Sequence, residues 1–64
     1  MADLLVEQWD RVRVLTLNRP DVLNAISRTL ATEIVNQVEE AEDDEETRVI
    51  VIRGSGRDFS AGYD

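Results

Sequence analysis

One short apolar segment, residues 48–53 (RVIVIR), constrains the fold of this chain more than any other feature. Extended backbone points successive side chains to opposite faces, so the two valines face one way and the two isoleucines the other. Strands that are apolar on both faces are typical of parallel sheets, which are covered on both sides. The segment therefore predicts an α/β fold in which this strand pairs in parallel with another one.

The residues before this segment supply two further strands. Residues 4–10 (LLVEQWD) and 12–17 (VRVLTL) are strand-like and are separated by a tight turn at Asp10-Arg11, which predicts an antiparallel hairpin. The pattern then breaks at residues 18–21, because Pro20 has no amide hydrogen and disfavours helical angles in the residue before it.

An amphipathic helix of about four turns is predicted between the second and third strands. Ser27 is the predicted N-cap, because its hydroxyl can accept a hydrogen bond from a free amide of the first turn. We expect the helix to fray near Ala41, since the acidic residues that follow oppose the helix dipole and repel each other. The apolar stripe recurs at helical spacing and consists of Leu30, Ile34, Val38 and Ala41, widened by Ala31 and Val35.

The order β-β-α-β predicts where a ligand would bind. The second and third strands should be parallel through a right-handed crossover, so the segments that follow them leave from the same edge of the sheet. Ligands of open α/β sheets collect at that carboxyl edge. We therefore expect the first loop (residues 18–25) and the second loop (residues 54–64) to meet in space.

Composition excludes several kinds of chemistry. The chain has 64 residues, enough for one small domain or part of a larger one, and contains no cysteine and no histidine. Disulfides, Ser-His-Asp triads and nearly all transition-metal sites are thereby excluded, and we expect no metal site. A chain this short buries only about 60% of its unfolded surface. We expect it to fold weakly by itself, because it can cover only one face of the third strand.

Charge argues against a nucleic-acid partner. The formal net charge is −7, and residues 39–46 (EEAEDDEE), here called the acidic run, hold half of the 14 acidic residues. A nucleic-acid binder needs a basic face, which this composition does not provide. The acidic run lacks the spacing of an EF-hand loop. A solvated helix end, adaptation to salt and a divalent-cation site all remain open for it.

Membrane insertion is not predicted either. No apolar segment approaches the roughly 18 residues that a membrane span requires. The first residues, Met1-Ala2-Asp3, lack the basic start of a signal peptide. The expectation is a soluble, cytoplasmic protein.

Each loop by itself has two interpretations. Gly54-Ser55-Gly56 lacks the third glycine and the immediate helix of a dinucleotide-binding motif, which favours a turn that ends the strand. The small residues 60–62 either expose amides that can donate to a developing oxyanion or simply pack tightly. In the first loop, Asn24 could cap a helix, and Val22 and Leu23 could pack into the core.

The ordered motifs of the two loops resemble those of the enoyl-CoA hydratase/isomerase (crotonase) family from about Val12 onward. The resemblance implies the ClpP/crotonase ββα spiral, of which only the first β-β-α-β portion is present. It also implies that residues 1–64 are a partial, N-terminal domain that ends after the first oxyanion-hole motif. The matching residues are Leu17-Asn18-Arg19-Pro20, Leu23-Asn24-Ala25, Arg48 to Ile52, Gly54, Gly56 and Phe59 to Asp64.

The resemblance also implies a reaction class and its residues. Members of the family bind acyl-CoA thioesters as substrates, without a further cofactor, and stabilise a thioester enolate with two backbone amides. One amide corresponds to that of Tyr63, and the other belongs to a glycine well downstream of this chain. Where many relatives have a lysine near the CoA phosphates, this chain has Asp21-Val22, and Arg19 or Arg57 could substitute. The implied substrate-binding residues are Leu23, Asn24, Ala25, Ala61, Gly62, Tyr63 and Asp64.

Other implications concern what lies outside the chain. The acid–base carboxylates of hydratases (lyases) and isomerases lie beyond residue 64, so the chain alone should be inactive. Tyr63 replaces the alanine or glycine common in hydratases, which should reshape the acyl pocket. Full-length relatives, some of them enzymes of fatty acid metabolism, form homotrimers or hexamers. The alternative is a non-catalytic CoA-binding or interaction module on the same scaffold.

Overall fold

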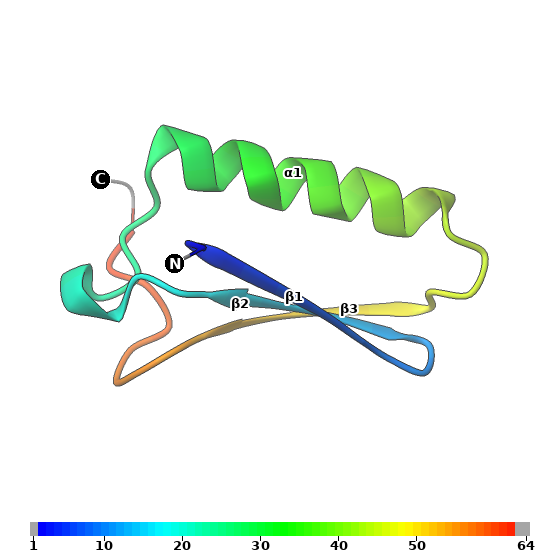
Figure 1. Cartoon of the computed structure of the whole chain (residues 1–64), viewed down its shortest axis with the longest axis horizontal. Coiled ribbons are helices and arrows are strands. Elements are labelled where there is room, and N and C mark those ends of the chain that lie inside the picture. Colours follow the sequence, from blue (N-terminus) through cyan, green and yellow to red (C-terminus); the bar gives the residue numbers. More distant parts are fainter. Residues whose placement is uncertain (1, 63–64) are drawn as a thin grey trace.

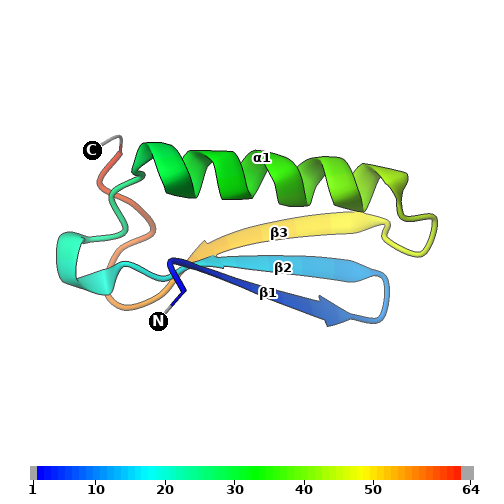
Figure 2. The ribbon, with the colours of Figure 1, turned by 45° about the horizontal axis from the view of Figure 1, so that its top comes forward.

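A computed structural model describes residues 2–62 and contains the predicted elements in the predicted order. The three strands form one sheet in the order β1-β2-β3, and the long helix lies across one face of it (Figures 1 and 2). The one element that the sequence did not predict is a short 3₁₀ helix in the first loop. The bounds are β1 Leu4–Trp9, β2 Val12–Leu17, the 3₁₀ helix Pro20–Val22, α1 Arg28–Asp43 and β3 Val49–Gly54.

Strand pairing confirms both predicted relationships. Strands β1 and β2 are antiparallel with Trp9 opposite Val12, and β2 and β3 are parallel. Strand β1 is one residue shorter than predicted, because Asp10 enters the turn with φ 57°. Strand β3 begins and ends one residue later than predicted, since Gly54 still lies opposite Leu17 at the carboxyl edge.

The core lies between α1 and the sheet. Leu30, the first residue of the helix stripe, is fully buried against the sheet. By contrast, Val35 is 53% exposed, so it does not widen the buried stripe as predicted. The buried cluster consists of Leu4, Leu15, Leu17 and Leu30, with Ile26, Ile34, Val38 and Ile50 packed against it.

The opposite face of the sheet is not covered by any element within residues 2–62. Trp9 and Val49 are both more than half exposed there, and Val51 is 40% exposed. On the face toward α1, Ile50 packs against the core but Ile52 is 41% exposed. The prediction of cover on both faces of β3 is therefore met on one face only, and there in part. Apolar surface that stays exposed contributes nothing to the hydrophobic stabilisation of the fold, so the free energy of unfolding is lower than if this face were covered.

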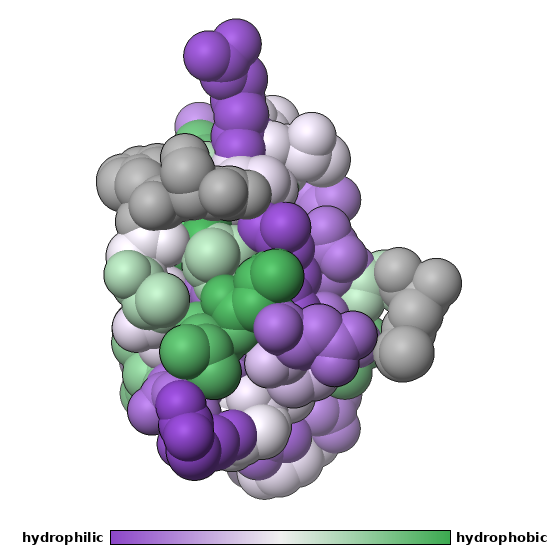
Figure 3. All heavy atoms as spheres, turned by 90° about the vertical axis from the view of Figure 1, so that its left-hand side faces the viewer, coloured by the Kyte–Doolittle hydropathy of each residue, from purple (hydrophilic) through white to green (hydrophobic). Residues whose placement is uncertain are grey.

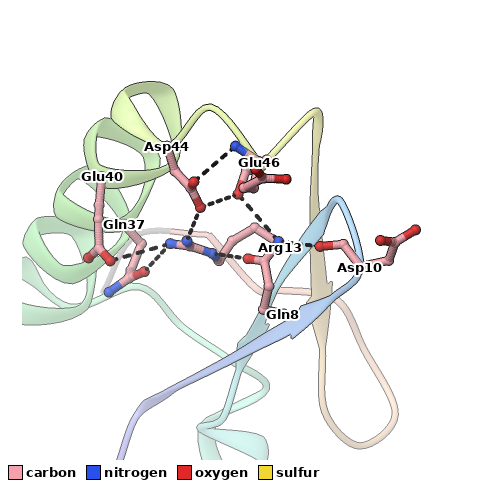
Figure 4. Close-up of polar contacts among 8 residues, drawn as sticks. Gln8, Asp10, Arg13, Gln37, Glu40, Asp44 and Glu46 are labelled. Carbon is pink, nitrogen blue, oxygen red and sulfur yellow. Dashed lines mark hydrogen bonds and ion pairs between the residues drawn. The ribbon is translucent and has the colours of Figure 1, made fainter.

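Arg13 on β2 joins the sheet to the C-terminal end of α1 (Figure 4). Its guanidinium donates to Gln8 Oε1 at 2.6 Å and to Gln37 Oε1 at 3.1 Å. It also lies 3.7 Å from Glu40 and 3.4 Å from Asp44, measured between nitrogen and oxygen. The positive charge of Arg13 thus offsets part of the negative charge of the acidic run.

The prediction that α1 frays near Ala41 is wrong. The helix continues to Asp43, and Asp44 is its C-cap. Two effects outweigh the repulsion: the Arg13 guanidinium lies beside the carboxylates, and Asp44 accepts hydrogen bonds from the Thr47 hydroxyl at 2.8 Å and from the Glu46 amide at 3.0 Å. The acidic run is therefore partly structural rather than only a solvated face.

This end of α1 should make stability depend on pH. The Thr47 hydroxyl, the Glu46 amide and Arg13 lower the pKa of Asp44 below 3.8. A carboxyl whose pKa is lower in the folded state contributes stability above its unfolded pKa and loses it as the pH falls through the folded value. We expect Asp44→Asn to remove part of the loss of stability below pH 3.8, measured by urea unfolding across pH. Identical pH profiles for both proteins would contradict this role.

Candidate functional site

The first and second loops lie side by side at the carboxyl edge of the sheet, at the left-hand end of Figure 1. The Ala61 amide donates to the Leu23 carbonyl at 2.9 Å, and the Ile26 amide donates to the Gly62 carbonyl at 2.9 Å. These bonds join residues more than 30 positions apart in the sequence. The expectation that the two loops meet is confirmed.

Asn24 is the link between the loops. Its side chain is fully buried, and its Nδ2 donates to the carbonyls of Ser55 and Asp58, both at 2.8 Å. Its Oδ1 accepts from the Arg19 amide at 2.8 Å. Asn24 is therefore not a helix cap. That role belongs to Ser27, as predicted, whose hydroxyl accepts from the Leu30 amide.

The first loop turns through two left-handed residues. Leu23 and Asn24 have φ of 54° and 55°, which asparagine tolerates better than most residues. The Leu23 amide donates to the Pro20 carbonyl at 3.1 Å and ends the 3₁₀ helix. This geometry leaves Val22 47% and Leu23 38% exposed. The interpretation in which both pack into the core is wrong.

Glycine is required where the second loop leaves β3. A Cβ on Gly54 would lie 2.7 Å from the Asp58 carbonyl oxygen and 2.8 Å from Asn24 Nδ2, and closer still to the Phe59 carbonyl oxygen. Gly56 has φ 76°, which confirms that the Gly54-Ser55-Gly56 triplet is a turn ending the strand. Gly54 is not among the predicted site residues, although a glycine at the end of a strand is a signal for close backbone approach.

The small residues of the second loop form a second link. The Ser60 hydroxyl donates to the Asn24 carbonyl at 2.9 Å and accepts from the Gly62 amide at 3.0 Å. Gly62 has φ 98°, a left-handed value that favours glycine. Ala61 and Gly62 are exposed. The predicted site residues Tyr63 and Asp64 lie outside the described residues.

Apolar surface surrounds these loops. Figure 3 looks onto this end of the molecule and shows hydrophobic side chains gathered between hydrophilic ones. A cavity of about 270 Å³ lies between α1 and the sheet beside the loops. Its lining is almost entirely apolar: Leu17, Ile26, Ala31, Ile34, Val35, Ile52 and Phe59. Such a surface suits an apolar group rather than a charged one.

The two arginines considered for a nucleotide have different surroundings. Arg19 Nη1 donates to the Ala25 carbonyl at 2.6 Å, and its Nε lies 3.9 Å from Asp3 Oδ2. Arg57 pairs with the neighbouring Asp58 at 3.1 Å, and its side chain is 79% exposed. Arg19 therefore holds the first loop together, whereas Arg57 presents its charge to solvent.

The acidic run is remote from the loops. Helix α1 has 16 residues and so separates the two ends by about 24 Å. Among residues 2–62, no three carboxylates are grouped so that they could hold a metal ion. Within the same part of the chain, no helix is long and apolar enough to cross a membrane.

Comparison with curated proteins identifies relatives over the whole chain. The chain is 44% identical over 64 residues to 2,3-dehydroadipyl-CoA hydratase of Escherichia coli strain K12, a match that covers 100% of this chain and 25% of the relative. It is 42% identical over 64 residues to the mitochondrial 3-hydroxyisobutyryl-CoA hydrolase of Gallus gallus, covering 98% of this chain and 17% of the relative. The chain thus spans a quarter or less of these relatives.

Solved structures agree with the sequence comparison. An enoyl-CoA hydratase of Mycobacterium tuberculosis matches with a TM-score of 0.95 at 38% identity, covering 98% of this chain and 28% of that one. An enoyl-CoA hydratase subunit of Geobacillus kaustophilus matches with a TM-score of 0.93 at 46% identity, covering 98% and 24%. The family model described as enoyl-CoA hydratase/isomerase matches residues 7–64. The chain belongs to the enoyl-CoA hydratase/isomerase family, and its β-β-α-β order is part of the crotonase-like fold.

Proposed function

We propose that this chain carries the CoA-binding segments and one oxyanion donor of an acyl-CoA-processing enzyme of the hydratase/isomerase type. The observation that carries the proposal is the pair of backbone hydrogen bonds, Ala61 to Leu23 and Ile26 to Gly62, that fastens the two motif-bearing loops together. The relatives named above have CoA thioesters in their names, which supports the same substrate class here.

The proposed donor is the backbone N–H of Tyr63. The Ile26 amide holds the carbonyl of Gly62 just before α1. This hydrogen bond anchors the residue immediately before the proposed donor. Fixed donors of this kind stabilise charge that develops only in the transition state, and losing one typically costs about 10²–10³ in rate.

The same loops are proposed to bind the substrate. Leu23 to Ala25 and Ala61 to Asp64 would contact CoA mainly through the main chain and the exposed side chains of the first loop. Arg57, whose side chain is largely exposed, is the better placed of the two arginines to meet a phosphate. The apolar cavity beside Phe59 suits an acyl chain.

The proposed chemistry is completed by groups from the rest of such an enzyme. In hydration, water loses a proton to a base while its oxygen bonds to the β-carbon, and the electron pair of the double bond shifts to give an enolate with negative charge on the thioester oxygen. A proton then adds to the α-carbon as the thioester carbonyl re-forms. The acidic run cannot serve as acid or base at this site, because α1 places even its first residue, Glu39, about 16 Å along the helix from the end beside the loops. We propose that the 64-residue chain alone does not turn over substrate.

A chimera tests this proposal. The matched quarter of the Escherichia coli 2,3-dehydroadipyl-CoA hydratase is replaced by this chain, and hydration of 2,3-dehydroadipyl-CoA is measured. We expect a kcat/KM within about tenfold of the parent enzyme, equivalent to about 1.4 kcal/mol of transition-state stabilisation. The unmodified parent is the control, and circular dichroism verifies that both proteins are folded.

Two outcomes would contradict the proposal. A folded chimera that binds a CoA thioester without turnover would favour the non-catalytic binding module on the same scaffold. A folded chimera that neither binds nor turns over the thioester would also contradict the proposal that CoA thioesters are the substrate class.

A further inference from the structure

Among the described residues of the predicted binding segments, Asn24 is the one whose side chain is completely buried. We propose that Asn24 is a positioning residue: its side chain sets the spacing of the two loops and thereby holds Gly62, the residue before the proposed oxyanion donor, and does not itself contact CoA. This inference rests on the proposed function. Any contact of Asn24 with substrate is thereby left to its main chain, through which the family makes most of its CoA contacts.

The side-chain contacts of Asn24 indicate a structural role for this side chain. Both of its polar atoms are already used within the protein, Nδ2 by the carbonyls of Ser55 and Asp58 and Oδ1 by the Arg19 amide. A ligand could contact this side chain only by breaking these buried hydrogen bonds. Each broken bond would leave a buried polar group without a partner. The side chain therefore belongs to the scaffold.

The main chain of Asn24 is linked to Gly62. Its carbonyl accepts from the Ser60 hydroxyl, which in turn accepts from the Gly62 amide. Two residues after Asn24, the Ile26 amide holds the Gly62 carbonyl. Gly62 is thus fixed on both its N–H and its C=O, and both restraints originate within two residues of Asn24.

Asparagine meets the requirements of this position and aspartate does not. The residue has φ 55°, where asparagine is enriched among residues other than glycine. The surroundings demand a donor facing two carbonyls and an acceptor facing one amide. Aspartate has the right shape but no donor, and its charge would face the carbonyl oxygens of Ser55 and Asp58.

Asn24→Asp in the active chimera is the direct test. We expect kcat to fall by about a hundredfold, as for loss of an oxyanion donor, while KM changes less than about threefold. The matched control is Asn36→Asp, which makes the same chemical change at an exposed position of α1 and should leave both constants unchanged. A raised KM with an unchanged kcat would instead identify Asn24 as a substrate contact and overturn the inference.

Ser60→Ala keeps the proposal testable if Asn24→Asp does not fold. This variant retains the Asn24 side chain and removes only the hydroxyl between Asn24 and Gly62. A fall in kcat of about tenfold at constant KM supports the inference. An unchanged kcat overturns it while leaving the proposed function intact, because the parent chimera remains active. If the parent chimera is folded but inactive, both the proposed function and this inference are contradicted.

Discussion

Gly54→Ala should detach the second loop from the first. The added Cβ would lie within 3 Å of three atoms that cannot easily move: the carbonyl oxygens of Asp58 and Phe59 and the side-chain nitrogen Nδ2 of Asn24. Overpacking of this kind costs about 3 kcal/mol when backbone has to shift. Because 1.4 kcal/mol is a factor of ten, amide hydrogen exchange at Ala61 should accelerate by about a hundredfold.

Gly62→Ala is the matched control for that experiment. A Cβ on Gly62 meets no atom of residues 2–60 within 4 Å, so the main cost is the strain of its φ of 98°. We expect a smaller acceleration of exchange, corresponding to about 1–2 kcal/mol. Equal exchange rates in the two variants would show that close packing at Gly54 does not hold the loops together.

Leu30→Ala should destabilise the whole fold. Leu30 is fully buried in the cluster between α1 and the sheet, and truncating such a leucine costs about 3 kcal/mol through lost transfer energy and the cavity left behind. A chain with one covered sheet face has little stability to lose. In the chimera, the urea midpoint of unfolding should fall clearly.

Val35→Ala provides the comparison on the same helix. Val35 is 53% exposed, so its truncation should cost below about 1 kcal/mol. A similar loss of stability in both variants would contradict the core described here and would place Val35 within the packed face of α1.

Much of the fold follows from local pattern. The hairpin, the stripe from Leu30 to Ala41 and the Ser27 cap each depend on neighbours in sequence. These predictions are confirmed except for Val35, which is exposed. The end of α1 could not be predicted because it depends on Arg13, which lies about 30 residues earlier and reaches the acidic run only in the folded chain.

The candidate site was predictable in place but not in detail. Topology alone brought the two loops to one edge, and the hydrogen bonds between them confirm it. The role of Asn24 could not be predicted, because a sequence motif gives the residue type at a position but not the hydrogen bonds that its side-chain atoms make within the protein. The exposure of Val22 and Leu23 depends on the left-handed turn, which short-range hydrophobicity does not reveal.

A crystal structure of the chimera with a bound CoA thioester tests the central proposal most directly. We expect the thioester oxygen within hydrogen-bond distance, about 2.7–3.1 Å, of the Tyr63 amide nitrogen, with the nucleotide portion alongside Leu23 to Ala25. A thioester bound elsewhere, or a Tyr63 amide paired with another protein group while the substrate is in place, would contradict the proposal.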